Sequence, residues 1–156
     1  MELRKYFVFF LLMMIAAVLP AEEMHGGHKV VTSDSLEWKE LKSLPPARVA
    51  VIIGDPAKEG LFTLRLSIPP GVKVLPHWHP SDEHVTVLTG TMRMGMGDKF
   101  DPASGTSIPA GGYSFVPAKM HHYAWFDEES VIQITGMGPW KIIYVNPEDD
   151  PANKTP

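Results

Sequence analysis

The segment Gly71–Gly90, GVKVLPHWHPSDEHVTVLTG, holds three of the seven histidines of this 156-residue chain. His77 and His79 are two residues apart, so on a strand their side chains point to the same side while Trp78 faces away. Glu83 has the same parity, and the intervening Pro-Ser-Asp bends the chain. The carboxylate can then join both imidazoles around one ion. Two histidines and a carboxylate form the facial ligand set used for iron(II), so the segment predicts a metal site.

Outside this segment, the chain from Arg48 onward consists of short runs rich in β-branched and aromatic residues, separated by Gly, Pro and Asp. In residues 61–68, apolar and polar side chains alternate as in a strand with one buried face. The predicted strands are 48–53, 61–68, 83–88, 91–96, 112–117, 122–126, 130–136 and 140–145. Such a series predicts an all-β sandwich or barrel. The histidine segment has no second copy, so we expect a single barrel.

The spacing within Gly71–Gly90 resembles the first motif of the cupin superfamily: glycine, five residues, His-x-His, three residues, glutamate, six residues, glycine. Every position of that motif matches. The resemblance implies a cupin conserved barrel, which is a jelly-roll β-sandwich, after a short helical or irregular lead-in. It implies no particular reaction, because cupins include dioxygenases, decarboxylases, isomerases, storage proteins and sensor domains.

A second and looser match follows, in which Gly111, Pro117 and His122 stand where the family has glycine, proline and histidine. Lys119 occupies a position usually held by glycine, and Phe126 one usually held by asparagine. The resemblance implies a metal centre of three histidines and one glutamate: His77, His79, Glu83 and His122. The alternative is that these polar residues line a barrel mouth without binding a metal.

Two adjacent histidines, His121 and His122, compete for one place at this predicted centre. Neighbours on a strand face opposite sides, so only one of them can point into the barrel. The family spacing selects His122. Ala124 and Phe126 should then line the interior, and His121 and Tyr123 should lie on the opposite face.

Three methionines, Met92, Met94 and Met96, alternate along another predicted strand. Their thioethers are soft ligands that suit copper, but apolar residues with a period of two need no such explanation. We predict that they line the barrel as core residues, because flexible methionine fills irregular space.

The first residues place Arg4 and Lys5 before the apolar run Tyr6–Leu19, which is too short for the roughly 20 residues of a membrane span. This pattern predicts a signal peptide, residues 1–21, cleaved after Ala21, with an uncleaved anchor as the alternative. The protein is therefore predicted to be exported, periplasmic or secreted, and free of the membrane after cleavage. The remaining predicted segments are a lead-in with one helical turn (22–46), the barrel (47–146) and a disordered tail (147–156).

Composition excludes several classes of function. Without residues 1–21 the chain has 12 basic and 17 acidic residues, a formal charge of −5 with neutral histidines, and no basic block. Binding to nucleic acid is therefore not expected. The chain has no cysteine, which excludes thiol catalysis, a thiolate zinc site and lipid attachment through cysteine.

These observations predict a metalloprotein that acts on a small-molecule ligand or substrate, either as a dioxygenase-like oxidoreductase or as a decarboxylase. One divalent ion is expected; Fe2+ or Mn2+ is favoured, and Zn2+, Ni2+ and Cu2+ remain alternatives because they accept the same ligands. The competing hypothesis is a non-catalytic ligand-binding or sensor module, since no acid or base stands out beyond the ligands and no catalytic residue can be assigned. A homodimer is also expected, from the resemblance to single-barrel cupins and from apolar Trp78, Tyr123 and Trp125, which need cover.

Overall fold

The computed structural model describes residues 27–153, of which those from Val31 onward form one compact unit. The predicted signal peptide lies outside the described residues. The described helices are three short 3-10 helices, Ser33–Ser35, Pro147–Asp149 and Pro151–Asn153. No helix in the described part of the chain has the length and hydropathy of a membrane span.

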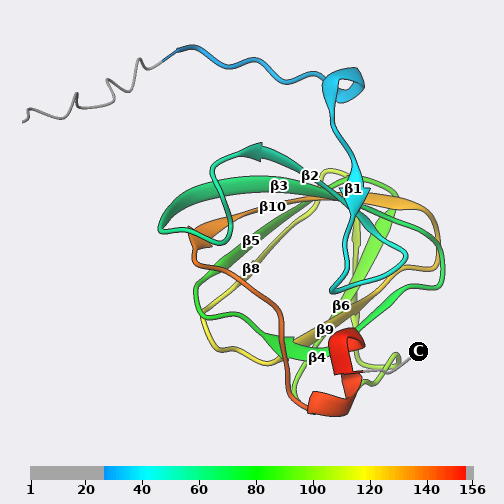
Figure 1. Ribbon diagram of the computed structural model, residues 1–156. Coiled ribbons are helices and arrows are strands. Elements are labelled where there is room, and N and C mark those ends of the chain that lie inside the picture. Colours follow the sequence, from blue (N-terminus) through cyan, green and yellow to red (C-terminus); the bar gives the residue numbers. More distant parts are fainter. Residues whose placement is uncertain (1–26, 154–156) are drawn as a thin grey trace, which may run out of the picture. The chain divides into compact units, whose positions relative to one another are not determined.

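Two antiparallel sheets face each other, as Figure 1 shows. Sheet A has the strand order β1-β2-β3-β10-β5-β8, and sheet B has the order β11-β4-β9-β6-β7. The strands are β1 (Lys39–Glu40), β2 (Arg48–Ile53), β3 (Gly60–Ile68), β4 (Lys73–Trp78), β5 (Glu83–Thr89), β6 (Thr91–Met96), β7 (Thr106–Pro109), β8 (Tyr113–Val116), β9 (His122–Trp125), β10 (Ser130–Gly138) and β11 (Ile143–Tyr144). The prediction of an all-β jelly-roll sandwich is confirmed.

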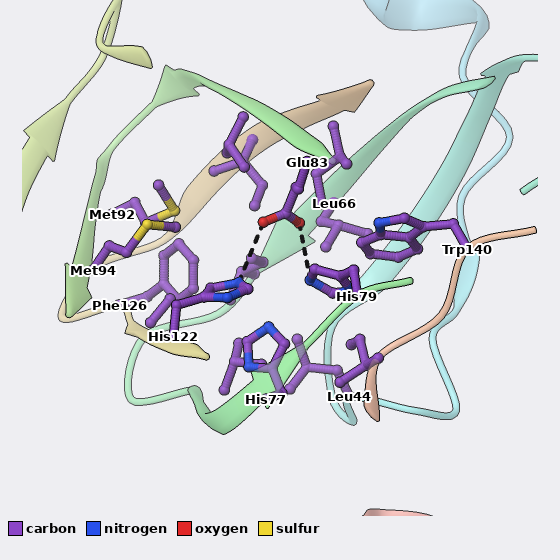
Figure 2. Close-up of a pocket in the computed structure, with 17 residues that line it drawn as sticks. Leu44, Leu66, His77, His79, Glu83, Met92, Met94, His122, Phe126 and Trp140 are labelled. Carbon is purple, nitrogen blue, oxygen red and sulfur yellow. Dashed lines mark ion pairs between the residues drawn. The ribbon is translucent and has the colours of Figure 1, made fainter. Parts of the chain in front are cut away.

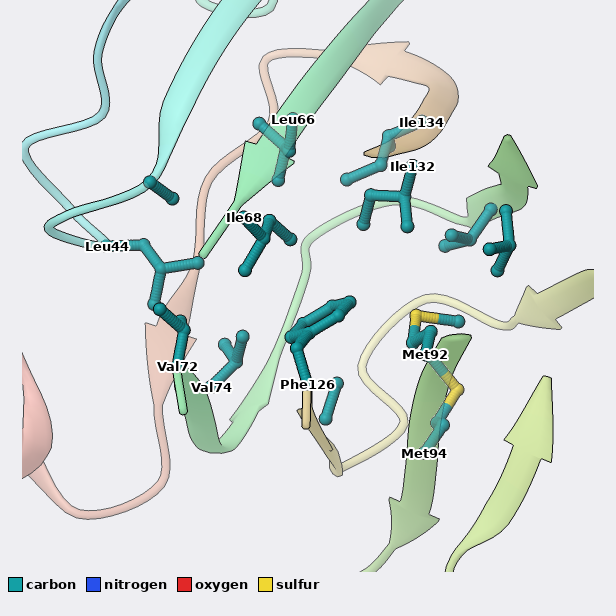
Figure 3. Close-up of a cluster of buried hydrophobic side chains, with 14 of the residues drawn as sticks. Leu44, Leu66, Ile68, Val72, Val74, Met92, Met94, Phe126, Ile132 and Ile134 are labelled. Carbon is teal, nitrogen blue, oxygen red and sulfur yellow. The ribbon is translucent and has the colours of Figure 1, made fainter. Parts of the chain in front are cut away.

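The hydrophobic core fills the space between the sheets (Figure 3). Strand β3 supplies its apolar set as the alternation predicted, with Phe62, Leu64, Leu66 and Ile68 all buried. Met92 and Met94 are core residues too.

The prediction for the third methionine, Met96, is wrong: its residue is 52% exposed. Met96 is the last residue of β6, where the chain leaves the sheet through Gly97 with a positive φ of 106°. The alternation of side chains along a strand therefore predicts burial only for those residues of the strand that lie over the core.

Part of the outer face of sheet B is covered by the chain itself. Tyr123 and Trp125 are buried beneath the loop after β6, where the Phe100 ring lies 5.2 Å from Tyr123 and 5.5 Å from Trp125. The Tyr123 hydroxyl donates to the Asp101 carbonyl oxygen at 3.0 Å. A Cβ atom at Gly105 would collide with the Trp125 ring, so the loop packs directly on the indole. Tyr123 and Trp125 thus find their cover within the chain and give no argument for a partner subunit, whereas Trp78 is half-buried.

The two ends of the barrel differ from the predicted segments. The helical turn of the lead-in is limited to Ser33–Ser35, and Lys39–Glu40 already pairs with β2, so sheet A begins before residue 47. Where a disordered tail was predicted, 147–153 form two 3-10 helices. Local side chains stabilise them: Asn146 accepts a hydrogen bond from the Glu148 amide, and Asp150 accepts one from the Ala152 amide.

Candidate metal centre

Both sheets contribute to a buried polar cluster inside the sandwich. His77 lies in β4, His79 directly follows that strand, and His122 is the first residue of β9. Glu83 is the first residue of β5 in the facing sheet. The four residues are only 1% to 5% exposed. Figure 2 shows that their side chains point toward one another, as the sequence predicted.

An irregularity in β4 turns His77 into the interior. The strand pairs Val74 with Ala124 and His77 with His122, so the register shifts by one residue between the two pairs. Without this bulge, Val74 and His77 would have opposite parity, yet both line the same cavity. Pro76 lies within the irregularity, where the ladder does not need the N–H that proline lacks.

Main-chain carbonyl groups fix the orientation of the three imidazoles. Each Nδ1 lies within hydrogen-bond distance of a carbonyl oxygen, which can only accept, so each Nδ1 carries the proton and donates. The pairs are His77 with Leu75 (2.8 Å), His79 with Lys141 (2.9 Å) and His122 with Met120 (3.0 Å). Each Nε2 is therefore left with a lone pair that faces the cluster, which is the form that binds a metal.

The imidazole nitrogens and carboxylate oxygens that face one another in the cluster have no proton between them with which to form a hydrogen bond. One ring nitrogen from each of His77, His79 and His122 lies within 4.8 Å of the other two. Glu83 places one carboxylate oxygen 3.5 Å from His79 Nε2 and the other 3.4 Å from His122 Nε2. The buried His79 Nε2 has no hydrogen-bond partner among the described residues. Lone pairs that face a carboxylate in a buried site are stabilised by a cation, so the cluster fits a metal ion.

Burial favours the neutral form of His77 and His79. Desolvation, followed by the nearby His122 and His79, holds the pKa of His77 well below its usual range. Desolvation also lowers the pKa of His79, although the Glu83 carboxylate opposes that shift. A histidine must be deprotonated to bind a metal, so the electrostatics of the site favour the ligand form.

The cluster faces a cavity of about 40 Å³ whose remaining walls are apolar. Ala124 and Phe126 line it, as parity with His122 predicted. Phe126 makes one wall apolar, at the position of the second cupin motif that asparagine usually occupies. Met92 and Met94 lie beside it on the His122 side of the site (Figure 2).

The sequence did not predict that Trp140 belongs to the site. Its indole stacks on the His79 ring, with 4.2 Å between ring centroids and 18° between planes. Trp140 lies 61 positions after His79, in the segment between β10 and β11. Only the tertiary fold brings it here, so spacing within the histidine segment held no signal for it.

The turn before β9 also shows what replaces the glycine of the second motif. Lys119 has a φ of 64°, in the left-handed region that glycine favours, and its N–H donates to the His79 carbonyl oxygen at 2.9 Å. His121 lies outside the cluster, and its Nδ1 is 2.6 Å from Asp98 Oδ1. His122 is thus the histidine that reaches the cavity.

Residues 27–141 match the family described as the ChrR cupin-like domain. No curated protein sequence is significantly similar to the chain.

Solved structures share the fold at low sequence identity. The polyketide cyclase RemF from Streptomyces resistomycificus aligns with a TM-score of 0.64 at 15% identity, over 80% of this chain and 90% of that chain. A proposed acetylacetone dioxygenase from Methylibium petroleiphilum PM1 gives 0.60 at 22% identity, over 80% and 85%. The DMSP lyase DddQ from Ruegeria pomeroyi DSS-3 gives 0.58 at 17% identity, over 74% and 64%.

Proposed function

Because the chain belongs to the ChrR cupin-like family, we propose that it binds one divalent metal ion through three histidines and one glutamate and acts on a small organic molecule. The ligands are His77, His79, Glu83 and His122. One observation carries the proposal: three imidazole lone pairs and one carboxylate meet in a buried cavity without a donor between them. A divalent cation supplies the positive charge that this arrangement lacks.

The proposed reaction is an oxygen-dependent or decarboxylating step on a small organic acid or enol. Fe2+ or Mn2+ is favoured; held by these four residues, either ion would supply Lewis-acid or electron-transfer chemistry to a small substrate. The residues of the chain orient the ligands and keep the cavity dry. The fold shared with a proposed acetylacetone dioxygenase is consistent with such chemistry.

A non-catalytic ligand-binding module is the second candidate. The observation that favours it is the lining of the cavity, in which the titratable side chains are the four candidate ligands. A reaction that moves protons generally needs a separate, tuned acid or base. Zinc or another redox-inert ion would then present a ligand without turnover.

Metal analysis and turnover assays separate the two candidates. The protein is expressed with its own leader sequence and purified from the exported fraction. Its metal content is then measured, and oxygen uptake and carbon dioxide release are followed with small acids and enols. About one Fe2+ or Mn2+ per chain with turnover supports the enzyme, and one Zn2+ per chain without turnover supports the module.

A matched pair of histidine variants tests the ligand set. His79→Ala should lose the metal, whereas His84→Ala, an exposed histidine in the same segment, should retain it. A wild-type protein that binds no divalent ion would contradict both candidates.

Export and dimerisation belong to the same proposal. N-terminal sequencing of the mature protein should begin at Glu22. Sheet A carries exposed apolar side chains at Leu61, Tyr113, Phe115 and Met137, which are 47% to 59% exposed and suit contact with a second copy. Light scattering over a wide concentration range should give a dimer, which Phe115→Glu should weaken; a monomer throughout would contradict this part.

A further inference from the structure

A second hollow lies beside the metal cavity. Its volume is about 300 Å³, and its walls come from the lead-in, from β2 and β3, and from residues 140–142. Leu66, Trp140 and Ile142 line both spaces. A single layer of side chains therefore separates the outer hollow, here called the outer groove, from the metal cavity.

The outer groove has the size and chemistry of a binding site for an apolar molecule. Its volume reaches the range of small-molecule sites, about 300 to 1,000 Å³. The metal cavity, at about 40 Å³, has room for roughly three water-sized groups. A substrate larger than a few atoms therefore cannot be held in the metal cavity alone.

The groove exposes apolar surface on the inner side of sheet A. Val51 lines it and is 51% exposed, although it pairs with the buried Leu64. The pairing register shifts after Val51, so that Ile53 pairs with Thr63. Ile53 is 48% exposed but does not line the groove. The strand thus places two equally exposed apolar residues in different surroundings.

Trp140, which lines both spaces, carries an unsatisfied donor. Its indole Nε1–H is buried and has no hydrogen-bond partner among residues 27–153. Its main-chain N–H donates to the Pro56 carbonyl oxygen at 2.7 Å, which holds the backbone in place. A buried donor without an acceptor costs roughly 1 to 3 kcal/mol, so a ligand oxygen at this position would be favourable.

We propose that the outer groove binds the apolar body of the substrate and that the indole N–H of Trp140 binds its polar end. The substrate class is a small molecule with a linear or flat hydrocarbon body and a terminal oxygen group such as a carboxylate. The inference rests on the proposed function, in that the oxygen group is directed at the metal centre. The Trp140 side chain lines both the outer groove and the metal cavity.

The test uses straight-chain carboxylates from butanoate to decanoate as probes, titrated calorimetrically into the metal-loaded protein. Affinity should rise about fourfold for each added methylene until the groove is full, since each buried methylene contributes about 0.8 kcal/mol. An affinity that does not depend on chain length would overturn the proposal.

Two variants of β2 form the matched comparison. Val51→Asn should weaken octanoate binding by roughly fivefold or more through the lost apolar contact, and Ile53→Asn, at the similarly exposed position outside the groove, should change it less than about twofold. Both variants should retain the metal. Equal effects of the two substitutions would contradict the assignment of the groove.

Substitution of Trp140 tests the proposed hydrogen bond from its indole N–H to the ligand. Trp140→Phe keeps an aromatic ring against His79 but removes the N–H. It should weaken every carboxylate by a similar factor, roughly five- to tenfold, and leave the dependence on chain length unchanged. A variant that binds the probes as tightly as the wild type would refute the role of the indole.

Measurements on metal-free protein separate this inference from the function on which it rests. If the proposed function is wrong, the chain binds no metal, but the methylene dependence and the Val51→Asn effect persist. If the groove is wrong, the metal binds and the methylene dependence is absent.

Discussion

His121 and His122 are neighbours in the chain, but only His122 reaches the metal cavity. His122 is 1% exposed and its Nε2 lies 3.4 Å from Glu83, whereas His121 lies at the surface beside Asp98. We therefore expect His122→Ala to lose bound metal and His121→Ala to keep it, as measured by elemental analysis of purified protein. The reverse outcome would show that the alignment of the second motif is wrong by one residue.

Replacing Glu83 by glutamine should affect metal affinity and metal-free stability in opposite directions. The variant loses the anionic ligand, so metal affinity should fall by roughly 30-fold or more, the equivalent of about 2 kcal/mol at least. In the metal-free protein, the new amide can donate to His79 or His122 Nε2, so unfolding should cost about 1 kcal/mol more than for the wild type. Competition with a chelator and urea unfolding measure the two effects.

The control for this experiment is Glu129→Gln, a substitution at an exposed carboxylate remote from the cluster. It should change neither quantity. If Glu83→Gln lowered the stability of the metal-free protein as well, the carboxylate would be accepting hydrogen bonds that the tautomers deduced for His79 and His122 do not allow.

The stability of the metal-free protein should fall as the pH decreases below about 6.5, the ordinary value for histidine. Burial lowers the pKa values of His77 and His79 in the folded state, so the unfolded chain takes up protons first. The contribution of these histidines is complete above the unfolded pKa and is lost as the pH falls toward the folded values, by up to about 1.4 kcal/mol per pH unit for each group. Urea unfolding between pH 7.5 and 5.5 should reveal the slope.

Variants separate this effect from general acid destabilisation. His77→Gln should make the slope shallower, whereas His28→Gln, at an exposed position, should leave it unchanged. Identical slopes in the wild type and His77→Gln would show that His77 is not a source of the pH dependence.

The left-handed backbone at Lys119 makes a distinct prediction. Its φ of 64° is unfavourable for a residue with a Cβ atom, by roughly 1 kcal/mol, and glycine avoids that cost. Lys119→Gly should leave the protein as stable as the wild type or up to about 1 kcal/mol more stable, and β-branched Lys119→Val should destabilise it by about 1 kcal/mol or more. Thermal unfolding checks the order Gly, Lys, Val; equal stability of all three would contradict it.

Local sequence patterns predicted the strands that can be recognised from their own residues. The alternation in 61–68 gave β3 and its buried face, because a period of two is a property of a single strand. The strand β4 was not among the predicted runs, since Pro76 interrupts its pattern and is tolerated only through an irregularity in its pairing with β9. Strand β7, which is short and ends in Pro109, was missed for the same kind of reason.

The residues of the cluster could be predicted from the sequence, whereas the residues around it could not. The resemblance to the cupin motifs selected His77, His79, Glu83 and His122, and the structure brings all four together. Trp140 and the outer groove depend on contacts between segments far apart in the chain, which no local period encodes. The source of the cover over Tyr123 was not predicted, because the loop that supplies it has no regular pattern.

The carbonyl groups that orient the three imidazoles have a consequence for how this protein can diverge. Any amino acid supplies a carbonyl oxygen, so the side chains at Leu75, Met120 and Lys141 are free to change while the histidines keep their aim. Because main-chain groups orient the cluster, its geometry depends on the path of the backbone and not on particular neighbouring side chains. Lineages can therefore replace the side chains around the cluster while His77, His79 and His122 keep their orientation.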